Sequence, residues 1–253
     1  MHRFSRLIPV VGILLLTTIA CRQIYIQIEE HRDRSYASNV LKMLANALQN
    51  YESTHKQLPP PTLAGHSWRI RVHPYAVSSP LYENYDFSRV WDSSENMLLD
   101  RRMLYDSKRP SEDHFGAMPF KFGASLNYPQ QTRFLMIVGD RCYGTNSGVR
   151  KLAEITDGLS NTIALVETSR SDVHWLHPID LHFDEMSFRI NDGALSIGNV
   201  NNDSPLVCFC DGEVFFVDPE VPSDALKALL TIDGEEEYDR RTCIANGWLI
   251  PSK

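Results

Sequence analysis

The N-terminal segment constrains the fold of this chain more than any other feature. Three basic residues, His2, Arg3 and Arg6, precede an apolar run from Leu7 to Ala20. A basic start followed by an apolar run is typical of an export signal, and basic flanks tend to stay in the cytoplasm. We therefore expect a membrane to be one partner of this chain, and the residues after the run to be exported.

Three fates of this segment are open, because the run is shorter than the ~20 residues that span a bilayer comfortably. The first is an uncleaved anchor, whose helix continues through a second apolar patch from Ile24 to Ile28. The second is a lipoprotein, since Thr18-Ile19-Ala20-Cys21 approximates a lipobox with Cys21 as the acceptor. The third is cleavage near Ala20 and release, which would leave Tyr25 and its neighbouring isoleucines without cover. We favour the anchor and assign residues 1–28 to it.

A helical stripe follows the anchor. After a charged stretch from Glu29 to Ser35, apolar residues recur at steps of three and four between Val40 and Tyr51. This spacing predicts one face of a helix, with Ser38 or Asn39 as a candidate cap.

Three consecutive prolines mark the end of that helix. Pro59, Pro60 and Pro61 offer no amide donors and fix an extended backbone, so the helix should end near Leu58. We therefore predict a helical stalk over residues 29–58 that continues the anchor and packs its far end on a globular head. The head comprises residues 59–253.

From Trp68 onward the pattern changes to short apolar stretches between turn residues, which is typical of a sheet-rich domain. Buried strands are predicted over Phe134–Val138 and Thr162–Val166. Pro222-Ser223 then opens a short helix from Asp224 to Leu230, with Ser223 as its cap and Asp233-Gly234 as its stop.

The clearest hairpin lies near the C-terminus. Two apolar stretches, Val207–Cys210 and Val214–Val217, flank Asp211-Gly212, and this dipeptide readily adopts the positive φ values of a tight turn. We therefore predict two antiparallel strands joined by that turn.

Composition limits the partners and the cysteine chemistry. The formal net charge of −7 is scattered along the chain, so there is no basic footprint for nucleic acid. The five cysteines match neither a zinc ribbon nor a regular disulfide framework. Cys208 and Cys210 are interpreted as buried thiols, whereas Cys142 with Cys243 is the one long-range pairing that merits a test.

Several separated segments together resemble one family, the secreted prepilin-type domain common in planctomycete bacteria and known as domain of unknown function 1559. Asp157-Gly158-Leu159-Ser160-Asn161-Thr162 with Glu167 is similar to its most recognisable motif, D-G-x-S-N-T followed by a glutamate. Further matches are Trp175, Pro178 and Asp180 at its W-x-x-P-x-D positions, Asp211-Gly212 at its C-terminal D-G, and Asn39–Tyr51 with Leu58-Pro59-Pro60 at its helix and F-P-P.

The resemblance implies an α+β, pilin-like or pseudopilin-like layout, in which a membrane-inserted N-terminal helix packs on a head with an antiparallel sheet. Two departures limit what carries over. The family's prepilin peptidase site, a glycine before F-T-L-V-E, is absent, and Asn201 replaces the histidine that often precedes the C-terminal Asp-Gly. Filament assembly in the pilin manner and any role of that histidine are therefore not transferred.

Two places offer candidate metal ligands. The densest cluster of potential ligands is formed by His174, His177 and His182 with Asp180, Asp184 and Glu185, but the histidine spacing matches no helical ligand pair, and Pro178 interrupts the segment. Oxygen ligands for calcium could come from the carboxylates of Asp157, Glu167 and Asp211, the Asn161 amide and the Ser160 hydroxyl. No loop, however, has acidic ligands at alternating positions. We interpret both places as polar loops and expect no metal or cofactor.

The sequence therefore predicts a membrane-anchored, extracytoplasmic structural or interaction protein of the bacterial cell envelope and no catalysis, because no nucleophile motif or phosphate loop is present. Its expected place is the inner membrane, with the head in the periplasm or extracytoplasmic space and envelope proteins as partners. The alternative is a binding module for a small molecule or peptide, built on the aromatic residues Trp68, Tyr75, Tyr82, Tyr85, Phe87 and Trp91, although such residues more often fill a core.

Overall fold

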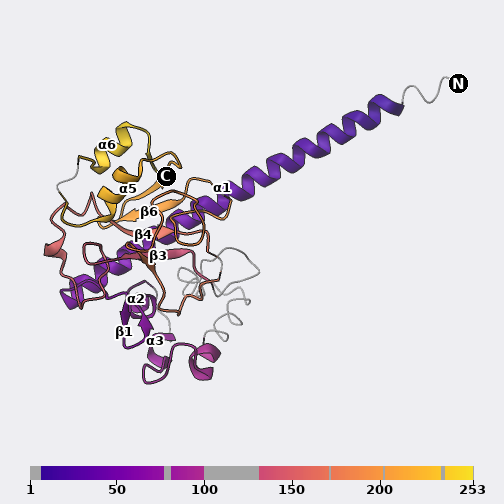
Figure 1. Ribbon diagram of the computed structural model, residues 1–253. Helices are drawn as coiled ribbons and strands as arrows, with labels where there is room; N and C mark the ends of the chain where they lie inside the picture. The colour runs from indigo at the N-terminus through magenta and orange to yellow at the C-terminus, as the bar shows by residue number, and fades with distance from the viewer. Residues whose placement is uncertain are drawn as a thin grey trace. The chain divides into compact units, whose positions relative to one another are not determined.

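The computed structural model describes residues 7–76, 81–99, 131–170, 172–201, 203–234 and 237–252. Side chains are described from Thr18 onward, except at Glu29, so the basic start and most of the first apolar run lie outside the described side chains. The chain divides into two compact units, Met1–Ala37 and Ser38–Lys253. Helix α1 (Leu7–His55) contributes residues to both units (Figure 1).

In the first unit, the helix exposes apolar side chains. Ile19, Ile24, Tyr25, Ile26 and Ile28 are between 43% and 64% exposed. A search of the described residues found no helix with a long enough apolar stretch to cross a membrane.

In the second unit, a mixed sheet is flanked by helices (Figure 1). After α1 come two short strands and two helices: β1 (Thr62–Leu63), β2 (His66–Ser67), α2 (Trp68–Ala76) and α3 (Leu81–Asn84). The sheet strands and the helices between them are β3 (Phe134–Val138), η2 (Leu152–Glu154), β4 (Ile163–Glu167), β5 (Leu181–His182), β6 (Leu206–Phe209), β7 (Val214–Val217), α5 (Ser223–Leu230), α6 (Arg240–Ala245) and β8 (Leu249–Pro251).

The strand order is β5-β3-β4-β6-β7-β8. Neighbouring strands pair antiparallel, except that β5 pairs parallel with β3. The α+β prediction is therefore confirmed. The predicted antiparallel pairing is also right for five of the six strands of this sheet: β3, β4, β6, β7 and β8. It is wrong at the β5 edge, where a strand of two residues gave no periodic signal to detect.

The sheet is buried on both faces, which explains why its strands appear in the sequence as continuous apolar runs. One face packs on α5, whose Ala225, Leu226 and Leu229 join the same core as Val207 and Phe209. A register shift in β4 between Ile163 and Leu165 breaks the usual alternation. Ile163 and Val166 therefore both reach that core.

The end of α1 packs in the second unit. Seven of its apolar residues are buried from Val40 to Tyr51, and the Gln49 amide donates to the Cys210 carbonyl at the β6–β7 turn. The predicted stripe is confirmed. Ser38 and Asn39 cap nothing, because the helix is continuous through them, and the Ser38 hydroxyl donates to Ser252.

Two predicted helix boundaries are wrong by a few residues. Helix α1 ends at His55 and not near Leu58, because Lys56 takes a positive φ of 56°. Helix α5 begins at Ser223, after Pro222, and the Ser223 hydroxyl donates to the Phe188 carbonyl and caps no amide.

The hairpin of β6 and β7 is confirmed, but its turn has three residues. Gly212 has a φ of +93°, and its amide donates to the Phe209 carbonyl at 2.9 Å. Asp211 is not among the described non-glycine residues with positive φ, so only the glycine needs that conformation. The block that follows Trp68 was expected to be sheet-rich and instead forms α2 and α3.

All five cysteines are free thiols, so the candidate pairing of Cys142 with Cys243 is not formed. Both belong to the core that packs on α5. Burial raises the pKa of the Cys142 thiol to about 12 and that of Cys243 to about 11. Cys208 is in β6, and Cys210 lies just beyond it in the turn; both are buried, as predicted.

Candidate functional site

The motif loop, residues 157–162, leads into β4 and turns most of its polar groups inward. The Asp157 carboxylate accepts a hydrogen bond from the Gly234 amide at 2.8 Å, and the Asn161 side-chain amide donates to the Asp157 carbonyl at 3.0 Å. The Thr162 hydroxyl contacts the carbonyls of Gly158 and Thr231. Gly158 has a φ of +91°, a left-handed conformation that favours glycine. The loop therefore ties the start of β4 to the segment after α5.

An arginine that the sequence reasoning missed joins this loop to the β6–β7 turn. Arg240 lies 2.8 Å from the Asp211 carboxylate, and its backbone amide donates to the Asn161 side chain at 3.3 Å. Its guanidinium also lies over the rings of Phe209 and Phe215. Two motif segments that are about fifty residues apart in the sequence therefore share one structural junction.

Glu167 occupies a second junction, at the other end of β4. Its carboxylate accepts from the Leu206 amide and the Asn199 side chain, each at 3.0 Å, and lies 3.4 Å from Arg133. The side chain is buried. A buried carboxylate is costly unless it is paired, and here three donors from different segments compensate it.

Asp180 occupies a third junction, where it forms a buried ion pair with Arg69 of α2. One carboxylate oxygen of Asp180 accepts from the Arg69 guanidinium at 2.9 Å, the Trp68 indole at 3.1 Å and the Met136 amide at 2.8 Å. Arg69 also donates to the Phe134 carbonyl on β3 at 2.9 Å. Burial raises the pKa of Asp180, and the Arg69 charge opposes that shift. The pair locks α2 onto the sheet.

Two other residues of the W-x-x-P-x-D block lie near this pair. Trp175 is buried, with its ring 6.0 Å from that of His73. The Pro178 carbonyl accepts from the Thr62 hydroxyl at 3.4 Å, so the block contacts β1 as well.

The structure does not bring the candidate metal ligands together. Glu167 lies at the opposite end of β4 from Asp157, and Asp157 and Asp211 are engaged by an amide and a guanidinium. Across the described ranges, no group of three or more His, Cys, Asp or Glu side chains is arranged to hold a metal ion.

The imidazoles have aromatic neighbours. His177 stacks on Trp91 with ring centroids 4.6 Å apart, and His174 lies 5.6 Å from the same indole. His182 is in β5. His177 is partly buried, which lowers its pKa.

A cleft beside these rings is one candidate binding site. It has a volume of about 420 Å³, and Phe87 and Trp91 line it together with Pro178 and the positive-φ turn at Ala64 and Gly65. The exposed Ser88, Arg89 and Asp92 also line it. The cleft therefore offers flat apolar surfaces beside groups that form hydrogen bonds, as small-molecule and peptide sites do.

The predicted aromatic block divides between the core and this cleft. Trp68 is fully buried, and the Tyr85 hydroxyl bonds to His66 at 2.9 Å. Tyr75 bonds to His55 near the end of α1. Of the block, only Phe87 and Trp91 line the cleft.

Comparison with known proteins agrees with the motif analysis. A family model described as protein of unknown function (DUF1559) matches residues 34–189, which is more than half of the chain. A search of curated proteins and a search of solved structures each returned no match.

Proposed function

This chain belongs to the DUF1559 family, and on that premise we propose that it is a membrane-anchored, extracytoplasmic, pilin-like protein of the cell envelope. It acts through its surfaces as a structural or interaction protein and not as an enzyme. The observation that carries this proposal is the exposed apolar surface of α1 ahead of the globular unit.

The apolar residues of α1 point to all sides of the helix. Consecutive residues in a helix are about 100° apart, so Ile24, Tyr25 and Ile26 face three directions, and all three are exposed. A partner protein would cover one stripe, whereas lipid surrounds a helix on every side. This distribution supports a lipid environment.

The sequence from Leu7 to Ile28 also supports an anchor, and it includes residues before Thr18, whose side chains the structure does not describe. A helix of these residues is about 33 Å long, close to the ~30 Å hydrocarbon core of a bilayer. Arg22 interrupts this region, and its long side chain can reach the membrane surface from a position near the end of the span. Glu30 and the charged residues after it belong outside the lipid.

The motif junctions support a role without catalysis. Asp157, Glu167, Asp180 and Asp211 each accept hydrogen bonds from amides or guanidinium groups that hold segments together. A catalytic carboxylate needs access to a substrate, and two of these four, Glu167 and Asp180, are buried inside the head. The hydrogen bonds of these four carboxylates thus support a structural role for the family motif.

Membrane fractionation of the producing cells tests the anchor. We expect the chain to stay with membranes after carbonate extraction, and mass spectrometry of the mature protein to find the residues before Ile28 retained. The variant Cys21→Ser should behave identically, because lipidation is not required. A mature protein with neither the apolar segment nor a lipid on Cys21 would contradict the proposal.

A second candidate function is ligand binding at the aromatic cleft. It is favoured by the half-buried Trp91, which lies against His177 and still lines a cavity together with Phe87. Thermal unfolding with a panel of oligosaccharides and peptides tests it. A ligand of this cleft should raise the melting temperature of the native chain but not that of Trp91→Ala.

A further inference from the structure

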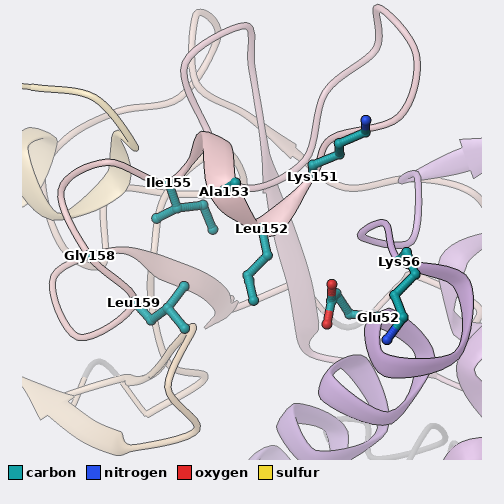
Figure 2. A pocket seen from close by; sticks show the side chains of 8 residues that line it. All are labelled: Glu52, Lys56, Lys151, Leu152, Ala153, Ile155, Gly158 and Leu159. Carbon is teal, nitrogen blue, oxygen red and sulfur yellow. The ribbon is translucent and has the colours of Figure 1, made fainter.

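A second cavity lies between the end of α1 and the segment that leads into the motif loop. Its volume is about 540 Å³, within the range of small-ligand sites. Figure 2 shows its lining residues: Glu52 and Lys56 come from the helix, and residues 151–159 form the opposite wall. All of these residues belong to the second unit.

One wall of this cavity is apolar because the motif loop turns its polar groups the other way. Asp157, Asn161 and Thr162 bond into the head, whereas Leu159, between them, remains half-exposed. In Figure 2, the side chains of Leu152 and Leu159 extend into the space between the loop and the helix. The family motif thus places an apolar surface beside α1.

The facing wall carries separated charges of opposite sign. Glu52 and Lys56 are four residues apart, a spacing at which such residues normally pair on a helix. No ion pair between them is formed, because Lys56 ends the helix with a φ of 56° and its side chain leaves the helical face. In Figure 2, the Glu52 carboxylate points toward Leu152, while the Lys56 side chain runs beside the end of the helix and does not point toward Leu152.

A third charge, Lys151, lies at the rim of the cavity. Its backbone amide donates to Glu154, but within the described part of the chain its ammonium takes part in no ion pair. In Figure 2 this ammonium extends away from the space between Leu152 and Glu52, so the cavity combines the Glu52 carboxylate and the Lys56 ammonium with a leucine-lined wall, and Lys151 adds positive charge only at its rim.

This combination selects among ligand classes. A fatty acid can pair with a lysine and cover the apolar wall, but it leaves the Glu52 carboxylate without a counter-charge. A basic apolar peptide suits Glu52, but the lysines repel it. A ligand with both charges and an apolar side chain pairs with Glu52 and with Lys56 and also covers the apolar wall. We propose that this cavity binds short apolar peptides through their free amino and carboxyl termini, with Glu52 holding the ammonium and Lys56 the carboxylate.

The length of a dipeptide agrees with the separation of Glu52 and Lys56. The termini of a dipeptide are roughly 7 Å apart, because each extended residue spans up to about 3.6 Å. The Lys56 amide donates to the Glu52 carbonyl at 2.7 Å, which keeps the two residues one turn apart, and their long side chains let one dipeptide reach both charges. This inference does not depend on the membrane anchor, and it concerns a different cavity from the aromatic cleft.

Isothermal titration of the full chain in detergent tests the proposal with three probes: Leu-Leu, N-acetyl-Leu-Leu and Leu-Leu-amide. We expect Leu-Leu to bind best, and loss of either terminal charge to weaken binding about fivefold, the upper end for an exposed ion pair. Binding of all three should weaken in Leu159→Ser, which removes part of the apolar wall.

Charge variants assign each end of the peptide. In Glu52→Gln the acetylated and free peptides should bind equally, and in Lys56→Gln the amidated and free peptides should. Glu83→Gln, a change of the same kind on the exposed face of α3, should leave the ranking unchanged.

Two results would overturn the proposal. One is equal binding of the three probes to the native chain, since the site would then ignore terminal charge. The other is no binding of Leu-Leu up to about 10 mM, below any useful affinity. Neither result bears on the membrane anchor, which is tested separately by membrane fractionation.

Discussion

The buried pair of Arg69 and Asp180 gives the sharpest prediction of stability. Both side chains are about 3% exposed or less, and the pair joins α2 to the loop that leads into β5. Asp180→Asn keeps the size and an acceptor oxygen for Trp68 and Met136, but it leaves the Arg69 cation without a counter-charge. The substitution Asp180→Asn therefore removes only the negative charge of Asp180.

The expected magnitude follows from this burial. Removing one member of a buried ion pair costs about 3–5 kcal/mol, because the other charge stays desolvated and unpaired. Arg69→Met should cost a similar amount, since it leaves the Asp180 carboxylate with only neutral donors. The double variant removes both charges together, so we expect it to lose about 2 kcal/mol, well below the sum of the single losses.

Urea unfolding of the full chain in detergent measures these free energies. Fluorescence reports on the buried Trp68 and Trp175, and far-UV circular dichroism should give coincident transitions if unfolding is two-state. Arg89→Met is the matched control. Arg89 is 56% exposed, and its carboxylate partners are 3.6 Å away, so its loss should cost at most about 1 kcal/mol.

A loss of stability in Asp180→Asn no larger than that in Arg89→Met would contradict this expectation. Such a result would mean that water reaches Arg69 and that α2 does not cover the pair. Additive single losses in the double variant would also refute it, because the two charges would then not depend on each other.

Three further predictions concern other parts of the head. In Cys21→Ser, native protein should take up no maleimide at neutral pH and four labels in urea, because burial raises the pKa of the remaining thiols; rapid native labelling would contradict their burial. Gly212→Ala should lower the unfolding free energy by about 1–2 kcal/mol, measured in urea, because an L residue resists its φ of +93°; an unchanged midpoint would mean that the turn differs. Asp239→Ala should cost about 1 kcal/mol at pH 7, because Asp239 caps α6 through the Thr242 amide at 2.7 Å. Hydrogen bonds from the Thr242 side chain and from its amide lower the pKa of Asp239, so the contribution of the cap is present above the unfolded pKa and is lost as the pH falls through the folded pKa. The loss of unfolding free energy in Asp239→Ala should therefore be smaller in acid than at pH 7. An equal loss in acid and at pH 7 would rule out a charged cap.

Local patterns predicted the elements that depend on neighbouring residues. The stripe between Val40 and Tyr51, the strand Phe134–Val138 and the β6–β7 hairpin were each visible because periodicity and turn chemistry act over a few residues. Helix ends were less accurate. The end of α1 depends on one backbone conformation at Lys56, which no residue type at that position signals.

The pairing partners of the motif residues were not predictable in this way. Arg240, Arg133 and Arg69 neutralise the motif carboxylates from positions between 29 and 111 residues away. The apolar stretch Trp68–Val72 contains two arginines, Arg69 and Arg71, but nothing in the sequence distinguishes the buried Arg69, whose burial required a carboxylate that the fold supplies.

Apolar spacing and turn residues were enough to predict the α+β class, the family, the stripe of α1 and the hairpin, because they act through local sterics and hydration. The role of the motif carboxylates as internal junctions, and the two cavities, emerge only in the folded chain. The cost of burying a charge, and the surface left open, depend on what distant segments bring to the same point in space.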